Sequence, residues 1–557
     1  MTKKDNKAWI PLICAVLFFV VLLLLYPKAN ATTYYVREAG NDGSAGTSWA
    51  TAWATVNKVN TTIAKGDSVF FGEGTYYGYS ILPPVGTGTA WTVYTCSTNT
   101  VETQHDPKIR SGDLITGWTQ HSGNVYKAYW NASGGYSGNE CQTMVQVEAD
   151  EMLACVTSIT NINNEGEFWY KLSVDSLYAW AWGGGDPDGY TLYASVKPVV
   201  YFYAGSQYRS IKFFGLDLQG GKQGVVLWTA PSSVNTNNVR FEHCHVAKSG
   251  YLNHENPACF FGEADYGNIR YDSVFIVACS LGYAIHQNAG GWDDATGHGG
   301  ATDFYSFSNT VVESCYVYGY SANGIAFKYT NEGITIRYNF IDGTNNKKGI
   351  TLYRDYADAE IYGNILDGRF SQVAMDIGAK DIGDTYGAHN VKIYNNTIVN
   401  FQELGIMFGN YDWESPVIFT GDNQVKYNVL YAYTRDGTDD EYNSGWIMSY
   451  HPSYCTACED DITIDSNAYY SSTDNFEGAC NGYNDYTFTQ WQSNCGEDAN
   501  GVANVALGLN MSTYALPDTT SLTMDTTYGG RAWTVYGAVQ PTAEEETVKT
   551  KIKGFKK

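Results

Sequence analysis

The sequence predicts an all-β protein in which short strands stack as a parallel coil. Three observations predict this class: a short motif recurs along the chain, its apolar residues alternate with a period of two, and turn-forming and aromatic residues are abundant. The 557 residues include 58 glycines and 46 tyrosines, and only 17% of them are charged. Many turns combined with few long charged side chains are typical of an extracellular all-β protein rather than a helical one.

The recurring motif is about eight residues long and has one marked position. An apolar residue lies three positions before the marked residue, and another usually lies two positions after it. The marked positions hold Leu216, Cys244, Cys279, Cys315, Asn339, Asn364, Asn396, Asn428 and Asn467. Neighbouring marked residues are 24 to 39 residues apart, so the segments between the motifs vary in length. That pattern indicates stacked strands joined by turns that absorb insertions.

Each motif is too short to bury its own apolar face, so neighbouring repeats must cover it. A parallel coil meets this need, because each turn of the chain lies about 4.8 Å above the last. We therefore expect the marked residues to form one vertical column. Stacked asparagine amides can hydrogen-bond along such a column, and stacked cysteines can fill the same space. A metal site of Cys244, Cys279 and Cys315 is the alternative, but asparagine takes this position in the later repeats.

A second strand follows each motif, in segments such as "IAFKYT", "ITLYRD" and "VAMDIG". Their first and third residues are large and apolar and are expected to face inward, which turns the fourth residue outward. The predicted outward column contains His286, Lys328, Tyr353, Asp376, Gly409 and Ser449. A further outward column contains Asn288, Thr330, Asp355, Gly378, Tyr411 and His451. Acid, base and cation along one face suit a linear polysaccharide lying across the strands; a solvated face with scattered polar residues is the alternative.

The beginning and end of the chain carry a resemblance to a known superfamily. "TYYVREAGNDGSAGTSWATAWATVNKVNTTIAKGDSVFFGEGTYY" contains a strand, a Gly/Asn/Ser turn, an amphipathic helix and a "GD-x-V-x-F" strand, and "FTQWQSNCGEDANGV" and "YGAVQP" lie near the end. With the repeats, these segments resemble the pectin-lyase-like superfamily. The resemblance implies a right-handed parallel β-helix, or solenoid, whose N-terminal helix caps the open end of the coil. Hairpin-like segments that break the repeat predict a small antiparallel β insertion.

These features divide the chain into six predicted parts. They are a signal peptide or membrane anchor over 1–31, an N-terminal cap and first coils over 32–140, the antiparallel insertion over 141–199, the parallel β-helix repeats over 200–470, a closing segment over 471–541, and a charged tail over 542–557.

A second resemblance suggests an activity. "FKYTNEGITIRYN" followed by "GITLYRD" is similar to the central segment of the alginate-lyase and chondroitinase-B family. The resemblance implies β-elimination, with Lys328 at the position of the family's base and Arg354 at that of its acid. In that family Ca²⁺ or a cation neutralises the uronate carboxylate. Ca²⁺ is a candidate ligand by this resemblance. Ser321 and Asn323, however, stand where the family has two acidic Ca²⁺ ligands, which argues against the Ca²⁺-assisted version, and the sequence requires no cofactor.

Glycoside hydrolysis is the alternative chemistry, and it needs two carboxylates. Asp355 and Asp376 are expected on adjacent coils, and Asp381, Asp384 and Glu403 are further candidates. A glycine-rich segment, 288–303, follows the His286 strand and could form a wall of the groove. The residues expected to bind substrate are Asp355, Trp292, Tyr411 and His298. A third alternative is a surface protein that binds glycans or has a structural role without catalysis.

The N-terminus and the charge predict location and partners. A basic start, an apolar run to Tyr26 and "ANA" at 29–31 are typical of a signal peptide, while an uncleaved anchor stays open. We expect a secreted or cell-surface protein that touches a membrane only through this segment. The net charge of −24 argues against nucleic acid as a partner. In an exported protein, disulfides are expected between Cys141 and Cys155 and among Cys455, Cys458, Cys480 and Cys495.

Overall fold

The structure is a computed structural model. It describes residues 31–96, 107–131, 143–203, 206–221, 223–228, 236–252, 258–263, 271–287, 300–343, 348–368, 370, 373–378, 386–401, 404–408, 417–432, 446–450, 462–471, 478–479 and 487–503. The predicted signal or anchor segment, the charged tail and most of the cysteines in the expected disulfides lie outside these residues. No helix among the residues described is both long enough and apolar enough to span a membrane.

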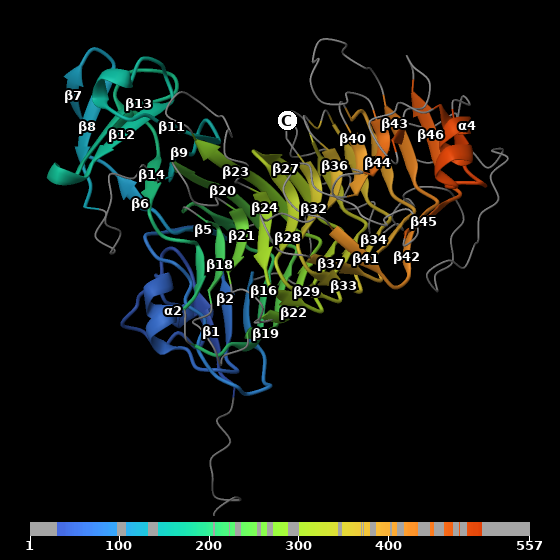
Figure 1. The fold of residues 1–557 in the computed structure, drawn as a ribbon. Coiled ribbons are helices and arrows are strands. Elements are labelled where there is room, and N and C mark those ends of the chain that lie inside the picture. Colours follow the sequence, from blue (N-terminus) through green and yellow to red (C-terminus); the bar gives the residue numbers. More distant parts are fainter. Residues whose placement is uncertain are drawn as a thin grey trace, which may run out of the picture.

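Three parallel sheets form the walls of a right-handed β-helix, which confirms the predicted fold (Figure 1). The ten-stranded sheet contains β15 (Val200–Phe202), β18 (Val225–Trp228), β21 (Ala258–Glu263), β24 (Gly300–Tyr305), β28 (Asn323–Lys328), β32 (Lys348–Tyr353), β36 (Val373–Gly378), β40 (Leu404–Phe408), β44 (Trp446–Tyr450) and β47 (Gly478–Ala479). The 12-stranded sheet contains β3 (Thr75–Tyr77), β5 (Lys108–Arg110), β17 (Asp217–Gln219), β20 (His245–Leu252), β23 (Ser280–Gln287), β27 (Tyr316–Tyr320), β31 (Phe340–Asp342), β35 (Ile365–Asp367), β39 (Thr397–Val399), β43 (Val429–Ala432), β46 (Ala468–Ser471) and β48 (Val502–Ala503).

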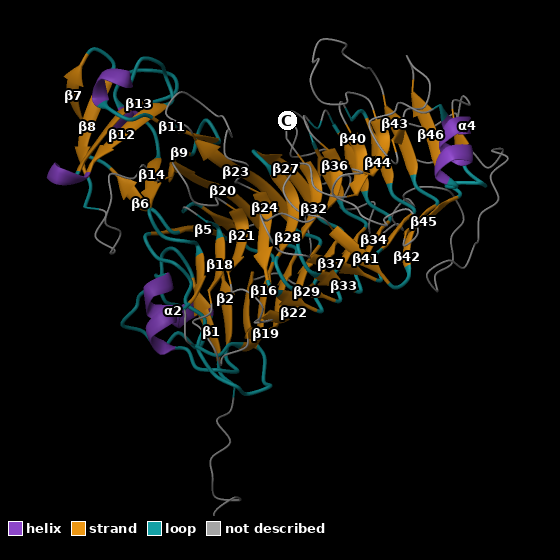
Figure 2. Cartoon of the chain, viewed as in Figure 1, coloured by secondary structure: helices purple, strands orange, loops and turns teal. Residues whose placement is uncertain are grey.

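The third wall is a 17-stranded sheet, and strands dominate the whole molecule (Figure 2). It contains β1 (Thr33–Val36), β2 (Ser68–Phe71), β4 (Thr92–Cys96), β16 (Arg209–Phe214), β19 (Thr236–Glu242), β22 (Tyr271–Val277), β25 (Phe307–Ser308), β26 (Val311–Glu313), β29 (Asn331–Glu332), β30 (Thr335–Arg337), β33 (Tyr356–Ala357), β34 (Glu360–Tyr362), β37 (Tyr386–His389), β38 (Lys392–Tyr394), β41 (Val417–Thr420), β42 (Asn423–Lys426) and β45 (Ile462–Asp465).

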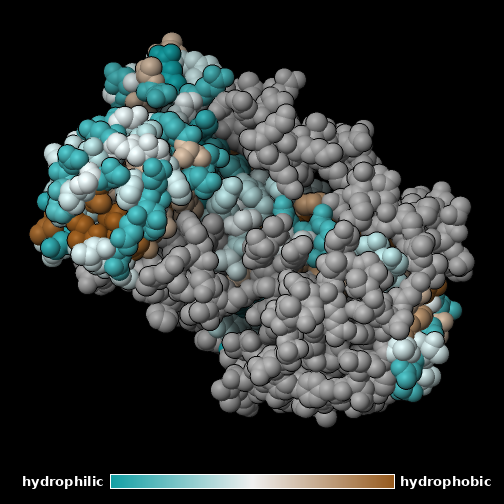
Figure 3. Space-filling view, turned by 90° about the horizontal axis from the view of Figure 1, so that it is seen from above, coloured by the Kyte–Doolittle hydropathy of each residue, from teal (hydrophilic) through white to brown (hydrophobic). Residues whose placement is uncertain are grey.

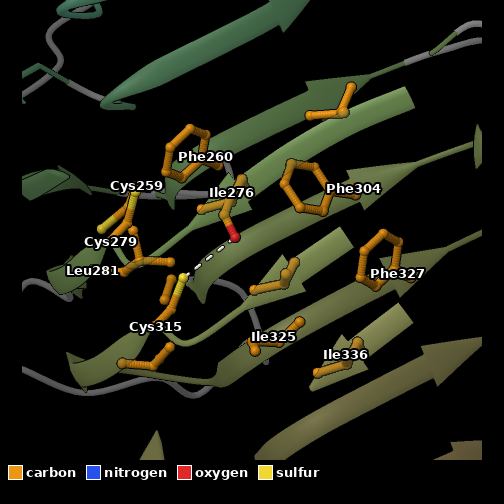
Figure 4. Packing of buried hydrophobic residues seen from close by; sticks show 14 of the residues in the cluster. Cys259, Phe260, Ile276, Cys279, Leu281, Phe304, Cys315, Ile325, Phe327 and Ile336 are labelled. Atoms are coloured by element: carbon orange, nitrogen blue, oxygen red, sulfur yellow. Dashed lines mark hydrogen bonds between the residues drawn. The ribbon is translucent and has the colours of Figure 1, made fainter. Parts of the chain in front are cut away.

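Apolar side chains of successive coils fill the space between the sheets. In the ten-stranded sheet, Ile325 pairs with Ile350, and Ile350 pairs with Met375 on the next strand. Phe304 and Phe327 are also register partners, with ring centroids 5.1 Å apart. Figure 4 shows these rings in the same core as the cysteine side chains, with Ile276 and Ile325 between them. Each coil therefore covers the apolar face of its neighbour, which is the stacking that the repeat predicts.

The marked asparagines form the predicted ladder. Each side-chain Nδ2 donates to the Oδ1 of the next asparagine, at 2.9 Å from Asn339 to Asn364, 2.9 Å from Asn364 to Asn396, 3.0 Å from Asn396 to Asn428 and 3.0 Å from Asn428 to Asn467. Every one of these five residues is at most 1% exposed. The buried amides satisfy one another and nearby backbone carbonyls, so each asparagine fixes the register of its coil.

The cysteines continue the same column, as predicted. Cys244, Cys279 and Cys315 are buried free thiols. The Cys279 thiol donates to Val277 O at 3.4 Å, and the Cys315 thiol to Ile276 O at 3.5 Å, which Figure 4 marks with a dashed line. Burial, followed by the neighbouring thiols, raises the pKa of Cys279, so this thiol is a neutral, weakly polar filler of the column.

Short helices lie at both ends of the coil (Figure 2). Near the N-terminus, η2 (Trp49–Thr51) precedes α2 (Val56–Thr62), and Val56 and Val59 of α2 pack into the core. The side chain of Thr55 caps this helix by accepting a hydrogen bond from Lys58 N at 3.1 Å. At the far end lie α4 (Phe488–Gln490) and the π-helical turn η6 (Trp491–Cys495), where the Trp491 side chain enters the core. The predicted N-terminal capping helix is confirmed.

Asp498 closes the asparagine ladder. Its Oδ1 accepts from Asn467 N at 3.1 Å, and its Oδ2 accepts from Asn467 Nδ2 at 3.3 Å and from the Tyr469 hydroxyl. Burial raises the pKa of Asp498 from 3.8 to about 7, although these hydrogen bonds act in the opposite direction. A raised pKa means that folding favours the protonated acid. The resulting stability is present in full below about pH 4 and is lost as the pH rises through about 7.

Asp498→Asn is expected to remove this pH dependence from the closing segment. Asparagine keeps one oxygen to accept from Asn467 N and carries no charge at any pH, while its NH2 group replaces the oxygen that accepts from Asn467 Nδ2 and Tyr469. The gain in stability at pH 8 is at most about 4 kcal/mol, at about 1.36 kcal/mol for each pKa unit. Hydrogen exchange of the amides of 487–503 at pH 5 and pH 8 measures it. If wild type and variant show the same change in exchange between the two pH values, Asp498 is not the titrating group.

An insertion of two small sheets stands beside the first coils (Figure 1). Its four-stranded sheet contains β6 (Asp113–Ile115), β9 (Thr143–Gln146), β10 (Glu151–Met152) and β14 (Leu192–Ser195), and its five-stranded sheet contains β7 (Thr119–Ser122), β8 (Val125–Tyr129), β11 (Ala154–Cys155), β12 (Glu167–Lys171) and β13 (Ser176–Trp180). The turns η3 (Ile159–Asn161), η4 (Leu172–Val174) and η5 (Pro187–Gly189) join them. All pairings but β11 with β12 are antiparallel, as predicted.

The insertion has its own core and a mostly hydrophilic surface (Figure 3). Its antiparallel strands begin at Asp113, earlier than the predicted start at 141, because β6 to β8 pair with strands that come later in the chain. Across its junction with the β-helix, Lys248 of β20 makes an ion pair with Asp150. The insertion is therefore a folded appendage held against the 12-stranded sheet.

Candidate active site on the ten-stranded sheet

The register of the ten-stranded sheet decides which side chains meet on its outer face. Lys328 of β28 is the register partner of Tyr353 of β32. Two residues earlier, a second outward column contains Asp303, Ala326, Thr351, Asp376 and Met407. Alternate residues of a strand face the same side, so both columns point away from the core. The two columns bring polar side chains of four successive coils onto one face.

His286 does not belong to the predicted column. It lies in β23 of the 12-stranded sheet, where its register partner is Tyr251. The segment "YAIHQ" continues the strand that begins at Ser280 and does not start a new one. The strand of this coil that lies next to Lys328 is β24, which comes after the glycine-rich segment. Because β23 continues for eight residues without a turn signal, the prediction assigned His286 to the ten-stranded sheet when it lies in the 12-stranded sheet.

Asp376 faces outward as predicted, but its place in the column differs. It is the register partner of Thr351, whereas the partner of Tyr353 is Gly378. The reason is that Met375, and not Val373, aligns with Ile350. Asp376 therefore lies diagonally from Tyr353, on the next coil and two residues earlier.

Lys348 joins Tyr353 and Asp376 in one hydrogen-bonded group, the Lys348 cluster. Its Nζ donates to Tyr353 Oη at 2.8 Å and to Asp376 Oδ2 at 2.7 Å. The side chains of Lys348 and Asp376 are only 7% and 1% exposed. Carboxylates are almost never buried to this degree without a partner. Asp376 therefore fixes the ammonium of Lys348, and the ammonium in turn fixes the oxygen of Tyr353.

A second group, the Lys328 cluster, has the same composition. The Nζ of Lys328 lies 2.8 Å from Asp303 Oδ1 and donates to Tyr305 Oη at 3.3 Å. The Tyr305 hydroxyl also donates to Asp303 Oδ2, at 3.2 Å. In both clusters the lysine Nζ lies 5.2 Å from the centroid of the tyrosine ring. The same three residue types thus recur on neighbouring coils, but here the aspartate and the tyrosine share a strand, whereas in the Lys348 cluster the lysine and the tyrosine do.

The two clusters are neighbours, because Lys328 and Tyr353 lie opposite each other on adjacent strands about 4.8 Å apart. Both of these side chains are partly exposed. Beside them, the guanidinium of Arg354 lies 4.0 Å above the ring of Tyr329. The two residues have φ of 69° and 65°, respectively, so the chain leaves both strands through the same left-handed turn. Lys328, Tyr353 and Arg354 form the solvent side of the site, and the aspartates form its floor.

Two further residues near the site have roles inside the fold. The Oδ1 of Asp355 accepts from Gly387 N at 2.8 Å and so links two coils. Tyr356 is 2% exposed and points into the core. Burial, and after it the charge of Asp376, raises the pKa of Tyr356 well above 10, so this phenol is neutral. Substrate binding by Asp355 stays a prediction.

Several predicted site residues lie outside the described part of the chain. They are Trp292, His298 and Tyr411 among the expected substrate-binding residues, Asp381, Asp384 and Glu403 among the carboxylates, and Asn288, Gly409 and His451 of the two predicted outward columns. Ser321 and Asn323, which stand where the resembling family has its Ca²⁺ ligands, belong to the described part of the chain. The Oδ1 of Asn323 accepts a hydrogen bond from Thr351 Oγ1 at 3.0 Å. Among the residues described, no group of three or more His, Cys, Asp and Glu side chains is placed to hold a metal ion.

Three residues of the clusters were missed by the sequence reasoning: Asp303, Tyr305 and Lys348. A signal for them exists in three aligned segments, "GATDFY", "NGIAFK" and "KGITLY". The structure places these segments in register as β24, β28 and β32. Asp303 was placed at the end of a glycine-rich segment, and the predicted strand "ITLYRD" began at Ile350, two residues after Lys348. In neither case did the prediction find where the strand begins, which is Gly300 for β24 and Lys348 for β32.

Comparisons with known proteins give structural neighbours only. No protein-family model matches the chain, and no curated protein matches it in sequence. Among solved structures, XylC in complex with xylose is similar with a TM-score of 0.55 at 11% identity, over 85% of this chain and 86% of XylC. A GH136 lacto-N-biosidase from Eubacterium ramulus has a TM-score of 0.44 at 13% identity, over 85% of this chain and 68% of that one. A rhamnogalacturonan lyase has a TM-score of 0.38 at 11% identity, over 93% and 98%.

The likeness to XylC extends over most of both chains. At this level of identity it concerns the fold alone. The chemistry of the site must therefore be argued from the residues of this chain.

Proposed function

We propose that this protein is a carbohydrate-active enzyme that acts outside the cell and cleaves a uronate-containing polysaccharide by β-elimination. The observation that carries the proposal is the Lys348 cluster. A buried ammonium, held by Asp376, donates to the oxygen of Tyr353 at 2.8 Å on the outer face of a β-helix. An ammonium in this position stabilises the negative charge that the oxygen acquires when it loses its proton. Tyr353 is therefore suited to act as a base.

The proposed reaction uses Tyr353 as base and a cation to bind the carboxylate. The Tyr353 oxygen takes the proton from C5 of the uronate, a double bond forms between C4 and C5, and the bond from C4 to the glycosidic oxygen breaks. The phenol then returns its proton to the leaving oxygen, so the site needs no other acid. The C5 proton becomes acidic only when the uronate carboxylate is neutralised. We assign that role to Arg354, whose guanidinium lies above the ring of Tyr329 on the solvent side of the site.

Lys328 is better suited to hold substrate than to act as the base. To accept a proton, Lys328 would have to be neutral. Asp303, a carboxylate with 3% side-chain exposure, would then lose its cation. Leaving one buried charge without its partner is costly. In the proposed site Lys328 therefore stays charged, and it attracts the acidic polymer beside Tyr353.

The geometry argues against hydrolysis by the aspartates of the two clusters. Asp303 and Asp376 occupy the same column three strands apart, which corresponds to about 14 Å at about 4.8 Å per strand. Retaining hydrolases need carboxyl groups about 5–5.5 Å apart, and inverting hydrolases need about 6.5–9.5 Å. Each aspartate instead makes an ion pair with its own lysine, Asp303 with Lys328 and Asp376 with Lys348.

Incubation with a panel of polyuronates and neutral polysaccharides tests the proposal. We expect the absorbance of unsaturated uronates to rise with at least one polyuronate and with no neutral polymer. New reducing ends without that absorbance would show hydrolysis and overturn the proposed chemistry. Binding to a glycan in a pull-down, with no cleavage of any polymer, would show a non-catalytic binder instead.

A further inference from the structure

A small cavity lies where the insertion joins the β-helix. It is lined by residues between Gly78 and Lys197, none of which belongs to the two lysine clusters. Its volume is about 200 Å³. Four segments meet there: the turn after β3, the link from β5 to β6, the end of β8 and the end of β14. Two of these segments are where the chain enters and leaves the insertion. The cavity is therefore built jointly by the β-helix and the insertion.

Hydrogen bonds fix the inner wall of the cavity. The hydroxyls of Ser111 and Ser195 lie 2.8 Å apart, and they donate to Lys197 O at 2.7 Å and 3.1 Å. Both serines are at most 3% exposed. At Gly112, a Cβ atom would lie 2.6 Å from Ala194 O, so glycine allows the two crossing segments to touch. A preformed wall of this kind lowers the entropic cost of binding a ligand.

The mouth of the cavity combines an aromatic ring with polar groups. Tyr79 is 42% exposed. Asp113 is also exposed, and its Oδ2 accepts from Trp130 Nε1 at 3.0 Å, which orients the carboxylate. Asn131 adds an exposed amide to the lining. An apolar ring face beside oriented hydrogen-bond acceptors and donors matches a sugar ring, which has an apolar face and hydroxyls at its edge.

We propose that this cavity binds one neutral sugar residue of a glycan, with Tyr79 packing against the ring and Asp113 and Asn131 holding its hydroxyls. Its volume is below the range of about 300–1,000 Å³ found for larger ligands, which limits the occupant to a single ring. The carboxylate of Asp113 accepts hydrogen bonds from hydroxyls and offsets the charge of Lys197, which also lines the cavity, so the site has no net positive charge to attract a uronate. The site is independent of Tyr353 and does not rest on the elimination chemistry.

Calorimetric titration of the full chain with glucose, galactose, mannose, xylose and glucuronate tests the site. The protein should be produced without N-glycosylation, because Asn131 lies in an Asn-x-Ser sequence. We expect saturable binding of at least one neutral sugar and none of glucuronate. Tyr79→Ala and Asp113→Asn should each weaken binding about tenfold or more, which corresponds to about 1.4 kcal/mol. The side-chain oxygen of asparagine at 113 can still accept a hydrogen bond from Trp130. This variant therefore removes the charge and keeps the hydrogen bond that orients the side chain.

Tyr129→Ala provides the matched control. Tyr129 is 68% exposed and precedes Trp130 on β8, but it is not part of the cavity wall. This variant should bind the sugar as wild type does. The proposal is overturned if no neutral sugar binds saturably, if glucuronate binds equally well, or if Tyr79→Ala and Asp113→Asn bind like wild type. None of these readouts involves cleavage, so they are separate from the test of β-elimination.

Discussion

Tyr353→Phe is expected to lower kcat for polyuronate cleavage by about 10²–10⁴-fold, the usual contribution of a general acid–base group, with little change in KM. The substitution removes only the hydroxyl that Lys348 contacts at 2.8 Å. The ring remains in place 5.2 Å from the ammonium. Arg354 and the Lys328 cluster, which are proposed to bind the polymer, are untouched. Initial rates followed by the absorbance of unsaturated uronates measure the effect over a range of substrate concentrations.

Tyr356→Phe is the matched control for this experiment. Tyr356 lies three residues further along the chain and also loses one hydroxyl, but its side chain is buried in the core. In the described part of the chain, that hydroxyl has no hydrogen-bond partner. The control should keep the rate of wild type. If Tyr353→Phe also keeps it, or if both variants lose activity equally, the hydroxyl of Tyr353 is not the base.

The stacking of the coils could be predicted from sequence because it is a nearest-neighbour property. A buried asparagine every few tens of residues needs a partner for its amide, and the same residue one coil away supplies it. The chain from Asn339 to Asn467 follows this logic at every step. The inward residues Ile325 and Ile350 could be assigned for the same reason, since alternation within a strand is a local pattern.

The candidate site could be predicted only in part, because it depends on where each strand begins. Lys328 and Tyr353 were placed side by side correctly, since both end strands of equal length that begin with similar residues. His286 was placed in the wrong sheet, because β23 runs on for eight residues without a turn signal. Asp303, which holds Lys328, follows a glycine-rich segment in which no periodic pattern marks the start of β24.

Long-range pairing sets a second limit on what the sequence reveals. Lys348 and Asp376 are 28 residues apart, and they meet only because one coil separates them. A shift of two residues along the strand, caused by the alignment of Met375 with Ile350, places Asp376 within reach of Lys348. The strands of the insertion likewise pair across long separations, so its start at Asp113 gave no local signal. Register between coils is decided by packing, and a single sequence carries little information on it.

Asn396→Ala is expected to lower the free energy of unfolding by about 3–5 kcal/mol, near the upper end for a single substitution. The Oδ1 of Asn396 accepts from the backbone N and the side-chain Nδ2 of Asn364, at 3.1 Å and 2.9 Å. Its Nδ2 donates to Ile361 O at 2.9 Å and to Asn428 Oδ1 at 3.0 Å. Alanine leaves the backbone N of Asn364 buried without its acceptor and removes one partner each from Asn364 Nδ2, Ile361 O and Asn428 Oδ1, at a position that is 0% exposed. Denaturant unfolding measures the loss.

Asn395→Gly is the matched control for Asn396→Ala. It tests whether the loss of stability comes from the ladder hydrogen bonds or from removing any buried asparagine. Asn395 is the adjacent residue and is equally buried, but among the residues described neither polar atom of its side chain has a hydrogen-bond partner. Its φ is 54°, a conformation that glycine adopts without strain. This control should change stability by less than about 1 kcal/mol. Because each coil rests on its neighbours, the loss in Asn396→Ala should also speed hydrogen exchange in the coils on either side. If both variants unfold like wild type, the amide column does not hold the coils in register, and apolar stacking alone must do so.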